Sequence, residues 1–297
     1  MQVFVTGATG FVGSAVVEEL IGAGHKVLGL ARSDSGAAAL TALGAAVHRG
    51  LLEDLDSLRV GAATADAVIH TAFNHDFSKF AANCALDQAA IEALGEALNG
   101  SDRPLLVTSG LGQRAPGHVA TEQDPPIPPS TSYPRASEAT AAALAARGIK
   151  ATLIRLPPSV HGDGDHGFIP GLINIARQNG AAAYINEGLN RWSAVHRRDA
   201  ARVYRLALEP GAASGPFHAV ADTGVAFKDI ARVIARRLNI PLIGLTHEEA
   251  TKHFGWFTHF AEMDVPTSSE HTRAALGWRP EQLELIADMD RAAYFLS

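Results

Sequence analysis

The sequence contains a single cysteine, no long uninterrupted apolar run and no excess of positive charge. Cys84 therefore cannot form an internal disulfide, which fits a reducing compartment, and we expect it to be a small apolar core residue. Charged residues interrupt every Ala-rich stretch before it reaches the roughly 20 apolar residues that a membrane-spanning helix needs. Lys and Arg number 25 against 31 Asp and Glu, a net charge of -6. No broad basic field is therefore expected to hold a nucleic acid.

The N-terminus has no features of an export signal. Met1 leads directly into the apolar run Val3–Val5, with no basic segment and no small-residue cleavage site. We therefore expect a cytoplasmic protein that is neither exported nor bound to a membrane. The expected partner is a small-molecule substrate, and assembly as a homodimer is left open.

The 297 residues are 47% apolar and 19% charged, which suits one large α/β core with a smaller dependent lobe. Short β-rich runs alternate with longer Ala- and Leu-rich segments. The predicted strands are Val3–Val5, Lys26–Leu30, Ala67–His70, Leu105–Thr108 and Ala151–Arg155. This alternation predicts an α/β fold of Rossmann type, with a doubly wound parallel sheet.

The pattern also predicts how the chain divides into domains. We expect residues 1–160, with a return segment near 190–222, to form the domain with the parallel sheet. Residues 161–189 and 223–297 are expected to form a smaller C-terminal lobe that binds the substrate. Several prolines make residues 115–132 a predicted loop, which leads into a predicted helix containing Tyr133.

Three glycines follow the first predicted strand, and an amphipathic helix begins at once. Gly7 permits a tight turn, Gly10 lets backbone N–H groups approach a pyrophosphate, and Gly13 allows close packing of helix on strand. The helix dipole favours the anion, and strand, loop, helix and second strand follow one another within about 30 residues. The segment therefore predicts a dinucleotide site. The residues expected to contact the cofactor here are Gly7, Thr9, Gly10, Phe11, Val12 and Gly13.

The end of the second predicted strand decides between NAD and NADP, because a carboxylate there would bind the ribose 2′-hydroxyl of NAD. The chain has Arg32 and Ser33 at this point. A guanidinium can grip a 2′-phosphate, so NADP(H) is the expected cofactor and NAD(H) the alternative. Asp34 weakens this expectation, and a competing interpretation makes Arg32 a solvated surface residue.

From Thr6 to Gly13 the sequence resembles the extended and atypical short-chain dehydrogenase/reductase superfamily, the NAD(P)-dependent, epimerase/dehydratase-like group. The likeness extends over essentially the whole chain. Its other segments are Asp66–Ala72, Asn83, Leu105–Ser109, Arg155–Pro158, Arg191–Ala201 and Leu276–Pro280. The resemblance implies further cofactor contacts at Leu51, Leu52, Thr71, Ala72, Phe73, Tyr133 and Pro157. At residues 50–52, however, the chain lacks the carboxylate that the family usually places at the adenine.

The resemblance also implies a catalytic Ser or Thr together with Tyr-x-x-x-Lys, and the chain departs from this set. Tyr133 is present, but Ser137 stands where the lysine belongs. Without that ammonium, a phenol with a pKa of about 10 is mostly protonated near neutral pH and is a poor general base. Arg135 could supply positive charge, but two residues along a helix it would not face the same side as Tyr133.

The hydroxyl of the catalytic set is displaced as well, because Gly110 stands at its usual position. Thr108 or Ser109 is then expected to polarise the substrate oxygen while Tyr133 exchanges a proton with it. The expected reaction is hydride transfer between the nicotinamide and a small carbonyl or alcohol. One alternative is a dinucleotide-binding sensor that has lost the reaction, which Ser137 favours. A further alternative is a nucleotide-sugar epimerase or dehydratase, against which Ser137 counts.

His161, Trp192 and His196 are the expected substrate contacts. A solvated loop position competes with this role for His161, and packing competes with it for Trp192. Residues 161–166 include ligand types for a divalent metal, but polar Gly-rich turns often have this composition, and we expect no metal. The aromatic segment 253–260 is expected to wall the pocket, form a subunit contact or fill the core of the smaller lobe.

Overall fold

The computed structural model describes residues 1–115, 117–209, 211 and 215–296. Its strands are β1 Gln2–Thr6, β2 Lys26–Ala31, β3 Ala46–Arg49, β4 Ala67–His70, β5 Leu105–Gly110, β6 Ala151–Leu156, β7 Ser159–His161, β8 Ala182–Ile185, β9 Arg191–His196, β10 Phe217–His218, β11 Asp222–Ala226 and β12 Leu242–Leu245. Its α-helices are α1 Phe11–Gly22, α2 Asp34–Ala42, α3 Leu55–Ala63, α4 Phe80–Ala97, α5 Ser137–Ala146, α6 Phe168–Asn179, α7 Arg197–Leu208, α8 Phe227–Leu238, α9 His247–Phe254, α10 Thr258–Glu262, α11 Glu270–Leu276 and α12 Leu285–Met289. Three short 3₁₀ helices are η1 Phe77–Lys79, η2 Gly255–Phe257 and η3 Ala292–Phe295.

Seven strands form one sheet in the order β10-β6-β5-β4-β1-β2-β3, and every pair in it is parallel. The sheet contains all five predicted strands, so the Rossmann-type fold is confirmed. β1 pairs with β2 on one side and with β4 on the other, so the winding reverses between β1 and β4. Ligands of doubly wound sheets bind outside the carboxyl ends of the strands at this point.

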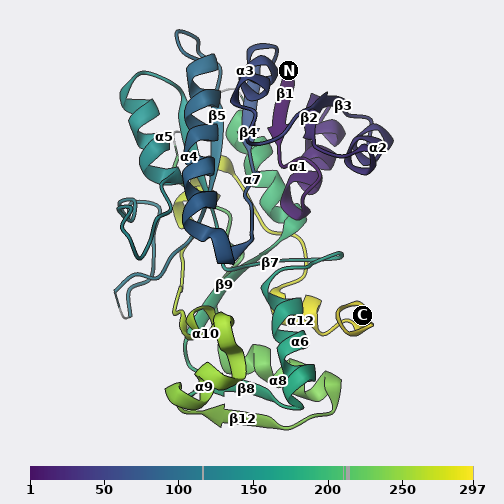
Figure 1. The fold of residues 1–297 in the computed structure, drawn as a ribbon, viewed down its shortest axis with the longest axis vertical. Coiled ribbons are helices and arrows are strands. Elements are labelled where there is room, and N and C mark those ends of the chain that lie inside the picture. Colours follow the sequence, from purple (N-terminus) through teal and green to yellow (C-terminus); the bar gives the residue numbers. More distant parts are fainter. Residues whose placement is uncertain (116, 210, 212–214, 297) are drawn as a thin grey trace.

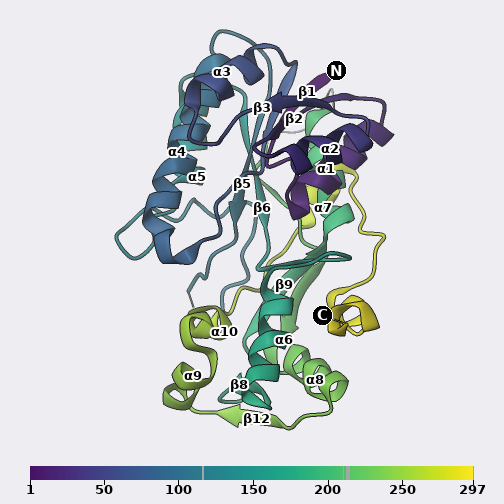
Figure 2. The same cartoon turned by 45° about the vertical axis from the view of Figure 1, so that its right-hand side comes forward.

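Helices cover both faces of the sheet, with α3, α4 and α5 on one side and α1 and α7 on the other (Figures 1 and 2). Val16, Val17 and Leu20 of α1 are buried in the same core as Val203 and Tyr204 of α7. A separate core lies on the other face, and its helical side chains include Leu58, Ala62, Ile91, Leu94 and Leu144. The sheet is therefore buried on both faces, as parallel sheets require.

The other end of the molecule forms a small lobe, which consists of α6, β8, α8, β12, α9, η2, α10 and α12 (Figure 1). Its own core includes Ile169, Phe227, Phe254, Phe257 and Leu285. A three-stranded sheet in the order β11-β9-β7 lies between this lobe and the seven-stranded sheet (Figure 1). The chain thus crosses between the two parts several times, which sets residues from distant segments beside one another.

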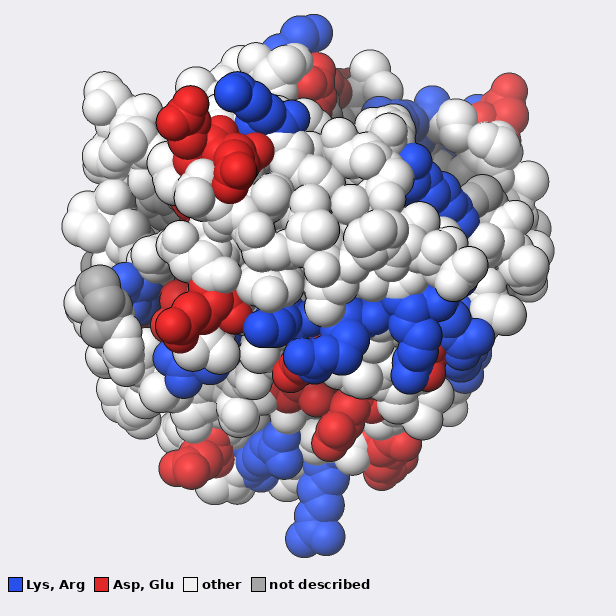
Figure 3. All heavy atoms as spheres, turned by 90° about the horizontal axis from the view of Figure 1, so that it is seen from below, with Lys and Arg blue, Asp and Glu red and all other residues white. Residues whose placement is uncertain are grey.

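The free end of the small lobe carries charges of both signs, and Figure 3 shows a band of Lys and Arg with Asp and Glu beside it. On α8, Arg232 pairs with Asp229, while Arg236 and Arg237 both pair with Asp290. Much of the positive charge of this helix is therefore balanced locally. No helix in the described part of the chain is both long and apolar enough to cross a membrane.

At Cys84 the local structure agrees with the sequence-based prediction, and at Tyr133 it differs. Cys84 is buried in α4, as expected of a core residue. The prediction of a helix containing Tyr133 was wrong, because α5 begins only at Ser137 and its N-cap is Ala136. Pro134 explains the difference, since a residue that precedes proline is disfavoured in the helical conformation.

Candidate active site

The glycine loop between β1 and α1 has a backbone that side chains would obstruct. Gly7 has a φ of +67°, in the left-handed region. Its carbonyl oxygen accepts a hydrogen bond from the N–H of Gly10 at 2.8 Å. A Cβ on Gly13 would lie 2.0 Å from that same oxygen. Gly10 caps α1 without a side-chain hydrogen bond, so no cap side chain occupies the N–H groups of the first turn. The loop therefore fits the pyrophosphate of a nicotinamide dinucleotide, which these N–H groups would bind.

Two arginines flank the end of β2, where a ribose phosphate would be recognised. Arg32 and Ser33 are exposed, and the Ser33 hydroxyl accepts a hydrogen bond from the Gly36 N–H at 3.1 Å. Arg49 lies beside Ala31 in the strand register and forms an ion pair with Asp34. The carboxylate that weakened the phosphate prediction is thus paired with a second guanidinium. No sequence motif points to Arg49, because only the pairing of β2 with β3 brings it here.

The expected floor of the cofactor site lies directly under the glycine loop. The Thr71 hydroxyl donates to the carbonyl oxygen of Thr6 at 2.8 Å. A Cβ on Gly7 would lie 2.7 Å from both the Ala72 nitrogen and the Thr71 hydroxyl oxygen, so these residues touch the loop. Of the other predicted contacts, Leu51 is exposed and Leu52 half-buried just beyond β3, Phe73 follows Ala72, and Pro157 is buried just beyond β6.

The two candidate hydroxyls on β5 are both engaged or enclosed. The Thr108 hydroxyl donates to the carbonyl oxygen of His70 at 2.7 Å and lies 2.8 Å from the hydroxyl of Tyr204, which then donates to it. Thr108 therefore has no proton left for a substrate oxygen. Ser109 is 1% exposed, and its hydroxyl has no partner among the described residues.

Tyr133 lies half-buried close to the end of β5. A Cβ on Gly112 would lie 3.6 Å from the Tyr133 hydroxyl oxygen, which places the phenol just beyond this strand. Burial raises the pKa of the Tyr133 phenol above its ordinary value, while the positive charge of Arg135 opposes the rise. The phenol is thus a proton donor at neutral pH, with a cation as a neighbour.

A buried chain of polar side chains runs from Arg135 back to β1. The Nε of Arg135 donates to the Ser137 hydroxyl at 3.2 Å, and that hydroxyl donates to Asp87 at 2.5 Å. Asp87 lies 3.1 Å from Nε2 of His70, whose Nδ1 lies 2.8 Å from the Thr6 hydroxyl. Burial by itself would raise the pKa of Asp87, but His70 and Arg135 hold it below its usual value. Ser137 is therefore a link to a buried carboxylate.

The sequence did not predict most of these hydrogen-bonded side chains, and the predicted orientation of Arg135 was wrong. Asp87 lies in no recognised motif, and His70, although it lies within the segment Asp66–Ala72, was given no role; only the contact between α4 and β4 joins the two residues. Arg135 was expected to face away from Tyr133 only if these residues formed a helix. Because both residues precede α5, helical spacing does not apply, and Arg135 reaches the Ser137 hydroxyl.

The predicted substrate residues lie deeper than expected. His161 is fully buried, with Nδ1 2.9 Å from Asp288 and its ring centroid 5.5 Å from that of His196. Trp192 is also fully buried, and its indole N–H donates to the Phe260 carbonyl oxygen at 3.2 Å. His196 is half-buried, and its Nδ1 accepts from the first turn of α7. Packing contacts therefore account for Trp192, and neither His161 nor Trp192 is exposed.

In the polar turn after β7, both aspartates interact with other groups of the protein. Asp163 pairs with Arg291, and one Asp165 oxygen accepts from the Gly167 N–H at 2.7 Å. Burial raises the pKa of Asp165 to about 6. Across the described ranges, no cluster of three or more His, Cys, Asp or Glu side chains could hold a metal ion.

The aromatic segment 253–260 divides between the small-lobe core and a contact with the other part of the molecule. Phe254 and Phe257 are buried in the core. Trp256 is 65% exposed and stacks on Phe77 of η1 with a centroid distance of 5.7 Å, and Phe260 contacts the same ring at 5.2 Å. Ring contacts thus join η1, just before α4, to the small lobe.

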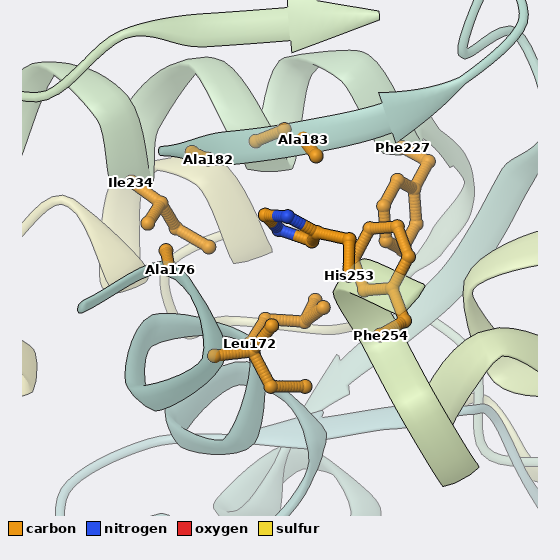
Figure 4. A pocket seen from close by; sticks show the side chains of 10 residues that line it. Leu172, Ala176, Ala182, Ala183, Phe227, Ile234, His253 and Phe254 are labelled. Atoms are coloured by element: carbon orange, nitrogen blue, oxygen red, sulfur yellow. The ribbon is translucent and has the colours of Figure 1, made fainter. Parts of the chain in front are cut away.

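A cavity in the small lobe is too small for a substrate. It lies among α6, β8, α8 and α9, and Figure 4 shows His253 pointing into it between apolar side chains. Its volume is about 10 Å³, room for roughly one water molecule. His253 Nε2 has no partner among the described residues, and burial lowers the pKa of this histidine. The cavity is remote from the glycine loop and is no part of the candidate site.

Several known proteins are similar to this chain over most of its length. The chain is 48% identical to an uncharacterized protein of Schizosaccharomyces pombe, over 99% of this chain and 100% of that one. It is 46% identical to an uncharacterized protein of Saccharomyces cerevisiae over the full length of both. A sterol-4-alpha-carboxylate 3-dehydrogenase (decarboxylating) of Dictyostelium discoideum is 28% identical over 76% of this chain and 73% of its own.

Solved structures share the fold over almost the entire chain. The UDP-glucose 4-epimerase of Thermus thermophilus in complex with NAD has a TM-score of 0.76 at 19% identity, covering 99% of this chain and 98% of that one. The family model for the NAD dependent epimerase/dehydratase family matches residues 3–220. The chain therefore belongs to the NAD dependent epimerase/dehydratase family.

Proposed function

We propose that the protein is an NADP(H)-dependent oxidoreductase that interconverts a carbonyl compound and its alcohol. The observation that carries this proposal is the Tyr133 phenol, held just beyond β5 with the Arg135 charge beside it. The glycine loop lies at the carboxyl end of β1 in the same sheet. A bound nicotinamide dinucleotide would supply or accept the hydride. Tyr133 would hold the proton that the substrate oxygen gains or loses.

The preference for NADP(H) rests on charge at the end of β2. Arg32 is exposed there, and Arg49 neutralises Asp34. The 2′-phosphate of NADP(H) would contact guanidinium groups and the Ser33 hydroxyl. The 2′-hydroxyl of NAD(H) would lack a free carboxylate to bind it, because Asp34 is paired with Arg49. We therefore expect the phosphate to add to the affinity of the protein for its cofactor.

Aromatic surface supports a carbonyl substrate with an apolar or aromatic body. The Arg135 guanidinium lies 4.3 Å from the ring centroid of Phe73, and Phe73 contacts Phe80 at 6.1 Å. Phe80 contacts Phe77, which stacks on Trp256 of the small lobe. The Dictyostelium discoideum relative is, by its name, a dehydrogenase of a sterol carboxylate.

A second candidate is a dinucleotide-binding sensor without turnover. The observation in its favour is that the Ser137 hydroxyl donates to Asp87, so that no ammonium lies at this position. A nucleotide-sugar epimerase or dehydratase is equally consistent with the family and is the third candidate.

One experiment separates the three candidates. Purified protein is incubated with NADPH and a panel of aldehydes and ketones, and with nucleotide sugars in a parallel series. Carbonyl-dependent consumption of NADPH supports the oxidoreductase. Tight binding without consumption supports the sensor, and conversion of a nucleotide sugar without net consumption supports the epimerase.

Within that assay, Tyr133→Phe tests the proton donor. Removing the phenol hydroxyl should lower kcat by about 100-fold or more, the usual contribution of general acid catalysis. Tyr184→Phe is the control, because that ring lies in the small lobe against Lys228. Unchanged turnover of every accepted carbonyl by Tyr133→Phe would refute the assignment.

A further inference from the structure

Arg135 presents a fixed guanidinium with unused donors at the end of β5. Its Nε donates to Ser137, and its planar head lies over the Phe73 ring at 4.3 Å. A Cβ on Gly110 would lie 3.8 Å from Nη1, so this nitrogen reaches the space that the missing side chain leaves. Within the described residues, neither terminal nitrogen donates a hydrogen bond and no carboxylate forms an ion pair with the group.

The buried chain behind Arg135 explains why a charged group is held in this position. Ser137, Asp87, His70 and Thr6 are all buried, and each is hydrogen-bonded to the next. A buried carboxylate is costly unless charge or hydrogen bonds compensate it. Asp87 is compensated by His70 and Ser137, and the Arg135 charge adds to this. The network fixes the guanidinium on one side and leaves its terminal donors free on the other.

We propose that Arg135 is a catalytic residue that donates a hydrogen bond to the substrate oxygen at the end of β5, next to the Tyr133 phenol. This inference rests on the proposed oxidoreductase function. As a hydride equivalent reaches the carbonyl carbon, the C=O π electron pair moves onto the oxygen. The O–H bond of Tyr133 breaks, its proton joins that oxygen, and a phenolate remains. Arg135 loses no proton, and its charge stabilises both oxygens while they are negative.

The Arg135 guanidinium would thus replace two missing groups, the hydroxyl that donates to the substrate oxygen and the cation that stabilises the phenolate. Gly110 offers no hydroxyl, and the Thr108 hydroxyl already donates a hydrogen bond to the backbone carbonyl oxygen of His70. Ser137 carries no charge, so Arg135 is the cation that stabilises a phenolate. A guanidinium suits this purpose because it stays charged and its donors form a rigid plane.

The other charged and titratable groups near Tyr133 do not replace Arg135. Arg114 also favours the phenolate, but less strongly than Arg135, while Glu138 and Cys84 oppose it. Glu138 is paired with Arg155 at 2.8 Å, so its charge is balanced within the protein. Arg135 therefore dominates the positive potential at the phenol.

The kinetic test uses Arg135→Met, Arg135→Lys and the double variant Arg135→Met/Ser137→Lys in NADPH-dependent carbonyl reduction. Loss of the donor should lower kcat by about 100-fold or more with a smaller change in KM. The limb of the pH profile that reports the phenol should move to higher pH. Because lysine at 137 would bring a cation back near Asp87, the double variant should recover part of the kcat that Arg135→Met loses.

Arg147→Met is the matched control, since Arg147 is an exposed arginine at the C-cap of α5. It should leave kcat and the pH profile unchanged. Wild-type kcat and an unmoved pH profile in Arg135→Met would overturn the proposal. Thermal unfolding of each variant shows whether it is folded. If Arg135→Met does not fold, Arg135→Lys, which keeps the charge but loses the planar donors, provides the test instead.

A second measurement needs no turnover and so separates this inference from the proposed function. NMR of the protein with ¹³C-labelled tyrosine rings, assigned with Tyr133→Phe, follows ionisation of the Tyr133 phenol in the absence of cofactor. Removing a cation this close should raise the pKa of Tyr133 by about one unit, and Arg135→Lys should raise it less. An unchanged pKa in Arg135→Met would contradict the proposed charge effect, even if no carbonyl compound proved to be a substrate.

Discussion

Replacing Gly13 with alanine should damage the cofactor site through backbone geometry alone. The added Cβ would lie 2.0 Å from the carbonyl oxygen of Gly7, 2.7 Å from its carbonyl carbon and 2.9 Å from the Thr71 hydroxyl oxygen. The first two are backbone atoms, which cannot rotate away. Either the loop or the start of α1 must move by about 1 Å to restore normal contact, and such overpacking typically costs about 1–3 kcal/mol of stability.

The size of this effect can be separated from helix propensity. Alanine is favoured over glycine inside a helix by about 1 kcal/mol, so a net destabilisation means that the clash exceeds this gain. Gly22→Ala at the other end of α1 is the matched control, because nothing lies within 4 Å of its added Cβ. That variant should be as stable as the wild type or slightly more stable.

Urea unfolding followed by circular dichroism measures the stability of both variants, and titration with NADPH measures their affinity. Gly13→Ala should unfold at lower urea and bind NADPH about tenfold more weakly or worse, since Gly7 and the first turn of α1 would hold the pyrophosphate. If Gly13→Ala bound NADPH and resisted urea as the wild type does, the glycine loop would not be the cofactor site.

Three further predictions concern charge. Arg32→Ala should weaken NADPH binding more than NADH binding, and an unchanged ratio of the two Kd values would refute the NADP(H) preference. The second prediction concerns Asp165. Because burial raises the pKa of the Asp165 carboxyl to about 6, this carboxyl binds its proton more tightly in the folded protein than in the unfolded chain. The penalty for ionising Asp165 is absent below pH 4, grows up to about pH 6 and then stays constant. Asp165→Asn should therefore raise Tm at pH 7.5, by the equivalent of at most about 3 kcal/mol of stability, and leave Tm nearly unchanged at pH 4. Equal shifts of Tm at the two pH values would contradict the raised pKa of Asp165. Arg155→Met should lower the unfolding free energy by about 3–5 kcal/mol, because it leaves Glu138 without its buried partner, and adding Glu138→Gln should recover part of the loss.

The sheet was largely predictable because its central strands are apolar and continuous. All five predicted strands lie in the seven-stranded sheet. The two missed strands lie at its edges: β3 is short and partly exposed, and β10 has two residues. β3 buries little apolar surface, and β10 is too short to show a period, so neither strand has a strong sequence pattern.

The candidate site was predictable only where the backbone itself is the functional group. The glycine spacing dictates a loop that the structure reproduces, since Gly7 needs its positive φ and Gly13 has no room for a Cβ. Arg49 and Asp87 could not be found in the same way. They reach the site through strand pairing and helix packing, which a local sequence pattern does not encode.

The most direct test of the account is calorimetric titration of the wild-type protein with NADPH and with NADH, repeated with Gly13→Ala. We expect saturable binding of NADPH, tighter than that of NADH, with most of the affinity lost in the glycine variant. Absence of binding heat with either nucleotide, or equal affinity in the wild type and Gly13→Ala, would contradict a dinucleotide site at the glycine loop.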